Sequence, residues 1–159
     1  MAVDGNEPVV KEIYIDAAPE TVFEFFVDSS KLCRWLALEA RLDPRPGGVC
    51  VQVHDGVDRG GGRCTMEGTF VAVEPPNHVA FTWGFADPTV HVKPGGSLVD
   101  VTLEPVGSGT RVVLVHRGLP PEEIGNHDQG WTTMLARLAD AVASQPSPVN
   151  TSVRNEGRS

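Results

Sequence analysis

Positive charge is scarce in this 159-residue sequence, and it never gathers into a run. The chain has 13 Lys and Arg residues against 21 Asp and Glu residues, so its formal net charge at pH 7 is -8. A nucleic-acid-binding protein needs a basic stripe to neutralise phosphates, and an anionic membrane surface attracts the same kind of stripe. The sequence therefore predicts neither a nucleic-acid partner nor a membrane-surface partner.

Cysteines and long apolar runs are also scarce. Cys33, Cys50 and Cys64 form no Cys-x-x-Cys pair, which argues against a disulfide framework and against a zinc site. We expect all three to be buried thiols in a reducing cytoplasm. No run of about 18 apolar residues is present, so no membrane span is expected. The polar N-terminus lacks the basic and apolar regions of a signal peptide, which also favours a cytoplasmic location.

The composition is that of a globular protein. A 159-residue chain with 40% hydrophobic residues can bury a core of its own in one domain. We expect this domain over residues 9–145. Residues 1–8 are expected to be flexible, and the small, polar residues 146–159 are expected to form a disordered tail.

A long amphipathic helix is predicted near the C-terminus, from Asn126 to Ser144. Asn126 and Gln129 resemble a capping box, and Pro120-Pro121 is expected to break the chain ahead of it. Its apolar stripe must be buried against another element. The stripe consists of six residues at helical spacing: His127, Trp131, Met134, Leu135, Leu138 and Val142.

Two short helices are predicted after a first strand. Pro19 suits the first turn of the first helix, where its missing N–H leaves no hydrogen bond unmade. Asp28-Ser29-Ser30 is expected to cap the second, which runs through Leu32, Trp35 and Leu36.

Alternating strands fill the rest of the chain. They cluster in the middle while helices lie towards the ends, which is typical of an α+β fold with an antiparallel sheet of six or seven strands. In the long strand, Glu67 falls on the solvent side. The expected strands are Val9–Ile15, Glu39–Asp43, Val49–Val53, Arg63–Val73, Val79–Phe85, Ser97–Glu104 and Thr110–His116.

With these elements placed, the sequence resembles the START-like superfamily, in the branch named after the activator of the ninety-kilodalton heat-shock-protein ATPase. One departure is Leu36, where many relatives carry a second Trp. The motifs that carry the resemblance are Ile15-Asp16-Ala17 followed by Pro19-Glu20-Thr21-Val22-Phe23, Leu32-x-x-Trp35, Asp43-x-Arg45-Pro46-Gly47-Gly48, Gly68-x-x-x-x-Val73-x-Pro75-Pro76, Gly109-Thr110-Arg111, Leu114-x-His116-x-Gly118-Leu119 and Gly130-Trp131.

The resemblance implies a helix-grip fold, in which a curved antiparallel sheet wraps around a long C-terminal helix and leaves a cavity between them. Relatives of this shape commonly bind small hydrophobic ligands, and some are cyclases or drug-sequestering proteins. We therefore expect a non-catalytic carrier, sequestration or sensing role, with His116 as a polar anchor in the cavity. The expected apolar ligand contacts are Trp35, Met66, Phe70, Phe81, Trp83 and Trp131, although the same side chains could simply pack the core.

Two other functions stay open. A cyclase or hydrolase would need an ionisable group in the cavity, and the candidates are His116, His127, Tyr14 and Glu67. His54, His78 and His91 fall in or near turns and are expected to be solvated. No nucleophile–base pair or metal-ligand spacing is visible, so we assign no catalytic residue, no metal and no cofactor.

The third function is that of a chaperone cofactor, as the name of the branch would suggest. In the eukaryotic activator, the resembling domain follows a separate N-terminal domain, whereas only eight residues precede the first strand here. We therefore do not expect this activity. Exposed apolar positions on the outer sheet face could support a homodimer.

Overall fold

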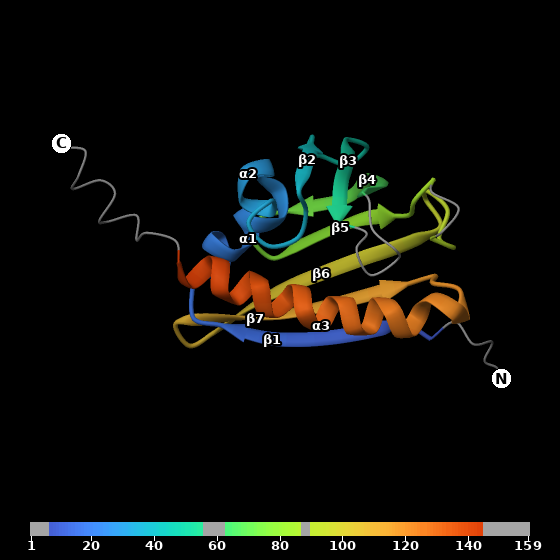
Figure 1. The fold of residues 1–159 in the computed structure, drawn as a ribbon. Coiled ribbons are helices and arrows are strands. Elements are labelled where there is room, and N and C mark those ends of the chain that lie inside the picture. The colour runs from blue at the N-terminus through green and yellow to red at the C-terminus, as the bar shows by residue number, and fades with distance from the viewer. Residues whose placement is uncertain (1–6, 56–62, 87–89, 145–159) are drawn as a thin grey trace.

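The computed structural model describes residues 7–55, 63–86 and 90–144. One seven-stranded antiparallel sheet forms its body, with the strand order β1-β7-β6-β5-β4-β3-β2 (Figure 1). All neighbouring strands in this order run antiparallel. The strands are β1 (Val9–Ile15), β2 (Glu39–Leu42), β3 (Val49–Asp55), β4 (Arg63–Glu74), β5 (His78–Trp83), β6 (Ser97–Val106) and β7 (Gly109–Arg117).

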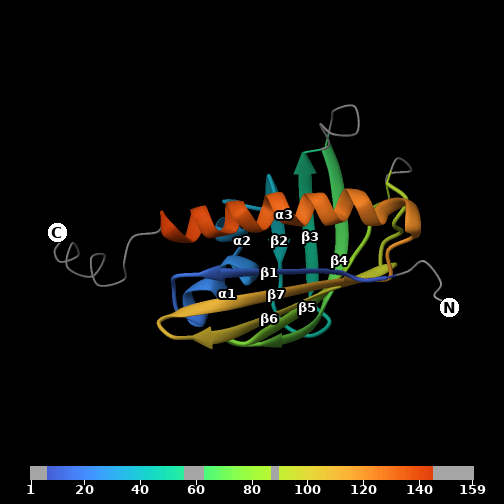
Figure 2. The same ribbon diagram turned by 90° about the horizontal axis from the view of Figure 1, so that it is seen from below.

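Three helices accompany the sheet: α1 (Pro19–Val27), α2 (Ser29–Leu32) and α3 (Pro121–Ala143). Figure 2 shows α3 running along β1 and passing across β2, β3 and β4. The sheet curves around this long helix, while α1 and α2 lie near the helix's C-terminal half (Figure 1). Arg34, just after α2, donates a hydrogen bond to the backbone oxygen of Ala141 in α3 (3.4 Å). The predicted α+β helix-grip fold is confirmed.

The long helix begins earlier than predicted. Its first residue is Pro121, so the expected start at Asn126 and the capping box there are wrong. Pro121 stands at the first helical position, where a proline lacks only an N–H that has no partner inside the helix. Glu122 and Glu123 follow in the first turn, where carboxylates suit the positive end of the helix dipole. The 23 residues of α3 span about 34 Å.

The second short helix is shorter than predicted. It ends at Leu32 instead of continuing to Leu36, and residues 33–36 form turns. Its predicted cap is confirmed, because an oxygen of the Asp28 side chain accepts hydrogen bonds from the backbone N–H groups of Ser30 (2.9 Å) and Lys31 (3.2 Å). These bonds lower the pKa of Asp28; the side-chain hydrogen bond from Ser30 is the largest cause.

The predicted alternation of buried and exposed residues is visible in the long strand β4. Cys64, Met66 and Phe70 are buried, while Glu67 is exposed as expected. Phe70 packs edge-on against Phe81 of β5, with ring centroids 6.1 Å apart. The concave side of the sheet therefore carries the aromatic core that α3 covers.

The cysteines differ in their burial. Cys50 and Cys64 are buried, but Cys33 is only partly buried, so the expectation of three buried thiols is wrong for Cys33. It follows directly after α2, in the segment that turns away instead of continuing as a helix. Burial raises the pKa of Cys50 to about 12, so this thiol stays protonated at neutral pH.

Several expectations concern parts of the chain that the structure does not describe. Most of the expected flexible N-terminus (1–8), the whole disordered tail (146–159) and the glycine-rich connection at 56–62 lie outside the described residues. Within the described ranges, no helix combines the length and the apolar character that crossing a membrane would require.

Candidate functional site

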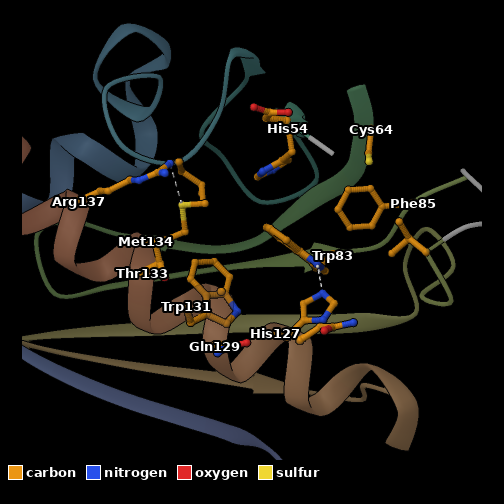
Figure 3. A pocket seen from close by; sticks show the side chains of 15 residues that line it. His54, Cys64, Trp83, Phe85, His127, Gln129, Trp131, Thr133, Met134 and Arg137 are labelled. Carbon is orange, nitrogen blue, oxygen red and sulfur yellow. Dashed lines mark hydrogen bonds between the residues drawn. The ribbon is translucent and has the colours of Figure 1, made fainter. Parts of the chain in front are cut away.

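A cavity of about 490 Å³ lies between α3 and the ends of β3, β4 and β5. Figure 3 shows His54, Cys64 and Phe85 on its strand side and Met134 and Arg137 on its helix side. The residues that line it are Leu36, His54, Asp55, Cys64, Trp83, Phe85, Val90, Asn126, His127, Gln129, Gly130, Trp131, Thr133, Met134 and Arg137.

One position on α3 has no side chain to fill the space beside it. Gly130 lines the cavity, and a Cβ atom built on it would meet no heavy atom within 4 Å. Glycine inside a helix destabilises it by about 1 kcal/mol relative to alanine. Gly130 therefore gives room at the cavity wall at the expense of helix stability.

Another glycine shapes the strand side of the cavity. A Cβ atom on Gly84, the residue after β5, would lie 1.7 Å from the backbone oxygen of Lys93. No other residue type could accept this close approach of two backbone segments. It allows the next residue, Phe85, to donate its N–H to the oxygen of Val92 (2.7 Å) while its side chain enters the cavity wall.

The structure separates the seven predicted ligand contacts into two groups. Trp83 and Trp131 line the cavity, with ring centroids 5.3 Å apart. The other five are buried in the surrounding core and are not part of the lining: Trp35, Met66, Phe70, Phe81 and His116.

Trp35 is the most clearly separate of these five. Its indole N–H donates to the backbone oxygen of Phe25 (2.8 Å), and its ring packs edge-on against Phe26 at 5.1 Å. Both partners belong to α1. Trp35 therefore ties the turn after α2 to α1 and is not part of the cavity lining.

His116 lies directly behind the cavity wall and is fully buried. Its Nδ1 accepts a hydrogen bond from the indole N–H of Trp131 (2.9 Å), so its Nε2 carries the proton and donates to Ser97 Oγ (2.9 Å). Ser97 in turn donates to the backbone oxygen of Trp83 (2.7 Å). Burial, and secondarily the electrostatic effect of His127, lowers the pKa of His116 to about 3. The imidazole is therefore neutral at pH 7, and both of its nitrogens are already bonded within the protein.

His127 has a matching arrangement on the cavity wall itself. Its Nε2 accepts from the indole N–H of Trp83 (3.2 Å), and its Nδ1 donates to the backbone oxygen of Glu123 one turn earlier (2.9 Å). The two imidazole rings stand 5.2 Å apart. Each indole thus donates to one imidazole, and the second nitrogen of each imidazole is bonded to Ser97 or to the backbone of Glu123, so these groups are bonded within the protein.

His54 is one of several cavity residues that the sequence prediction missed. It was expected to be solvated, but it lies near the end of β3, partly buried, and packs edge-on against Trp83 (5.3 Å) and Phe85 (6.0 Å). Its Nε2 is bonded to Gln52 Oε1 (3.0 Å), which can only accept, so Nε2 carries the proton. Burial, followed by the electrostatic effect of His127, lowers the pKa of His54 to about 4. The alternation Cys50, Gln52, His54 was the signal that could have placed it inside.

The other two histidines are not among the lining residues. His91 is exposed, as expected. His78 is only partly exposed, because its ring bonds Glu74 Oε1 (2.6 Å) and Asp100 Oδ1 (2.8 Å) on the sheet. Among the described residues, no group of three or more His, Cys, Asp or Glu side chains could hold a metal ion.

Comparisons with known proteins agree on one family. The sequence profile of the family described as "Activator of Hsp90 ATPase homolog 1-like protein" matches residues 16–143. The AHSA1 protein from Silicibacter pomeroyi is 32% identical, with a TM-score of 0.71 over 86% of this chain and 97% of that chain. Comparison with curated proteins found no match.

Two further solved structures have a similar fold. Protein CV1439 from Chromobacterium violaceum is 25% identical, with a TM-score of 0.74 over 87% of this chain and 99% of that one. Protein MLL2253 from Mesorhizobium loti is 24% identical, with a TM-score of 0.75 over 89% and 100%.

Proposed function

The chain belongs to the family of Activator of Hsp90 ATPase homolog 1-like proteins, and from this premise and the cavity we propose that it binds a small apolar or aromatic molecule between α3 and the sheet. The observation that carries the proposal is the cavity itself. Its volume of about 490 Å³ lies within the range of small-molecule sites, about 300–1,000 Å³.

The walls favour an aromatic occupant. Trp83, Phe85 and Trp131 offer ring edges and faces, and Leu36 and Met134 offer flexible apolar surface. Aromatic pairs gain about 0.5–1.5 kcal/mol beyond the burial of their area when they stack with an offset or edge to face. Each Å² of apolar surface that is buried contributes about 25 cal/mol to the free energy of binding. A ring system held here gains from both effects.

The hydrogen bonds of the wall favour a carrier, sequestration or sensing role over catalysis. General acid–base catalysis needs a nitrogen or oxygen that is free to exchange a proton with the substrate. Both nitrogens of His116 and of His127 are bonded within the protein. His54, with its pKa lowered to about 4, is a weak base at pH 7. We therefore propose binding without turnover.

A pair of glycine variants tests this function. We expect an apolar two-ring compound such as naphthalene or 2-naphthol to raise the melting temperature of the wild type, because it binds the folded state alone. Gly130→Leu should abolish that rise by filling the cavity. Gly125→Leu is the matched control: it also replaces a glycine of α3 with open space around its Cβ, but it does not line the cavity.

The pair separates blocked binding from damaged folding. Both substitutions remove a glycine from a helix and should leave the unliganded protein at least as stable as the wild type. An equal rise of the melting temperature in both variants would contradict binding in this cavity. Absence of any rise in the wild type across a panel of such compounds would contradict the proposed function.

A further inference from the structure

One cavity residue on the strand side has an unused hydrogen-bond acceptor. The Nε2–H of His54 donates a hydrogen bond to Gln52, so the neutral ring keeps a lone pair on Nδ1. Within residues 7–55, 63–86 and 90–144, nothing hydrogen-bonds to that atom. The ring is partly buried and is held edge-on by Trp83 and Phe85. An acceptor in such an aromatic wall gains a hydrogen bond only if a ligand or a water brings a donor to it.

One cavity residue on the helix side has an unused positive charge. Arg137 is the only Lys or Arg among the described lining residues. Its one hydrogen bond, 3.8 Å long, goes to the sulfur of Met134, which is a weak acceptor. No carboxylate among the described residues lies within 4.0 Å of its guanidinium. The guanidinium is a positive charge at the exposed edge of the cavity.

One acidic side chain lines the same cavity. Among the described lining residues, Asp55 is the only acidic one; it is exposed and has an interaction of its own. Gln129 and Thr133 are neutral and can donate to or accept from a ligand of either charge. His127 is already bonded on both ring nitrogens. Arg137 is therefore the charged lining group that has no carboxylate partner among the described residues, which favours an anionic group on the ligand.

Building on the proposed function, we propose that the ligand is an aromatic hydroxy acid, whose ring system fills the cavity while its hydroxyl donates to His54 Nδ1 and its carboxylate accepts from Arg137. A purely apolar ligand would leave both groups unused. A ligand with an ammonium group would meet the guanidinium as a like charge. Figure 3 shows His54 on the strand side and Arg137 on the helix side of the cavity, with Trp83 and Trp131 below both in this view.

Four naphthalene derivatives test the proposal because they share one ring system. Naphthalene has neither polar group, 2-naphthol has the donor, 2-naphthoate has the acid, and 6-hydroxy-2-naphthoate has both. We expect the last to bind most tightly by titration calorimetry in low salt. Each polar group should improve the dissociation constant by about threefold to tenfold, since one hydrogen bond contributes about 1 kcal/mol and an exposed ion pair about as much.

Three variants assign these gains to residues. Arg137→Gln should remove the advantage of the acid and leave the advantage of the hydroxyl. His54→Phe should do the reverse, because it keeps the aromatic packing and removes the acceptor. Arg45→Gln is the control for charge, since Arg45 is an exposed arginine outside the cavity and its loss changes the net charge equally. We expect it to behave as the wild type.

The outcomes distinguish the ligand class from the proposed function. If the four compounds bind equally well and neither cavity variant changes this, the ligand class is overturned while apolar binding stands. If 2-naphthylmethylamine, the cationic analogue, binds more tightly than 2-naphthoate, the role of Arg137 is overturned. If no compound binds to the wild type, the proposed function fails, and the ligand class fails with it.

Discussion

Replacing His116 by glutamine should remove a large part of the protein's sensitivity to acid. His116 is fully buried, accepts a hydrogen bond from Trp131 and donates one to Ser97. A glutamine can make both bonds, with its amide oxygen towards Trp131 and its amide N–H towards Ser97, but it does not titrate. The two proteins therefore differ chiefly in one proton-binding site.

The sign follows from the pKa of His116, which is about 3 in the folded protein against an ordinary value of 6.5. Between these two pH values the unfolded chain binds a proton at His116, whereas the folded protein does not. Stability therefore falls as the pH falls from about 6.5 towards 3. At 1.36 kcal/mol per pH unit, the wild type should lose on the order of 3 kcal/mol between pH 7 and pH 4 through this group.

Urea unfolding at pH 7, 6, 5 and 4, followed by far-ultraviolet circular dichroism, measures the effect. Carboxylates and the other histidines also titrate in this range, but their contributions are common to both proteins and largely cancel in the difference. The free energy of unfolding of His116→Gln should fall less steeply, by on the order of 3 kcal/mol over the range. Parallel curves for the two proteins would refute the conclusion that His116 is held neutral by its surroundings.

Three further predictions concern single contacts. Trp131→Phe removes the donor to the buried Nδ1 of His116. The unsatisfied acceptor should lower the free energy of unfolding by about 1–3 kcal/mol, and the lost packing should lower it further. A change below about 0.5 kcal/mol would show that the hydrogen bond contributes little to stability. Burial by itself lowers the pKa of His78, but hydrogen bonds to two carboxylates outweigh it and raise the pKa. His78→Gln should therefore lose most stability relative to the wild type below about pH 6.5, and this loss should disappear as the pH rises through the raised pKa. Urea unfolding should show a smaller difference in the free energy of unfolding between the two proteins at pH 9 than at pH 6. Asp28→Ala removes the cap of α2 and should cost about 1 kcal/mol, visible as a lower melting temperature, and an unchanged melting temperature would argue against the cap.

Local chemistry was enough to predict most of the elements. The alternation in β4 predicted its buried face, which the structure confirms. The family resemblance predicted the helix-grip fold, which the structure and the family comparison confirm. The start of α3 was misplaced because Pro121 was interpreted as a break. The same rule that correctly placed Pro19 at the start of α1 applies to Pro121, and applying it consistently would have extended the helix.

The cavity was harder to predict than the fold. Strand parity places Met66, Phe70 and Trp83 on one face, but it cannot say where along that face the helix stands away from the sheet. Of these three, only Trp83 lines the cavity, and Gly130 on the facing helix lies where the gap opens. That separation depends on the curvature of the sheet, which no local pattern encodes.

His54 shows a different kind of error. The strand that carries it was predicted to end at Val53, so His54 was assigned to a turn and to solvent. The strand in fact continues to Asp55, and the parity of Cys50 and Gln52, both buried, carries His54 to the inner face. Gln52 at an inward-facing position of the predicted strand was itself a signal, because a buried side-chain amide needs a hydrogen-bond partner close by.

The three tryptophans allow the most direct test of binding in the cavity. Trp83 and Trp131 line it and donate their indole N–H groups to His127 and His116, whereas Trp35 donates to a backbone oxygen elsewhere in the core. In a nitrogen-15 correlation spectrum, titration with 2-naphthol should shift the indole signals of Trp83 and Trp131 along a saturating curve and leave that of Trp35 in place. Saturable shifts confined to Trp35, or shifts of all three signals that never saturate, would contradict binding between α3 and the sheet.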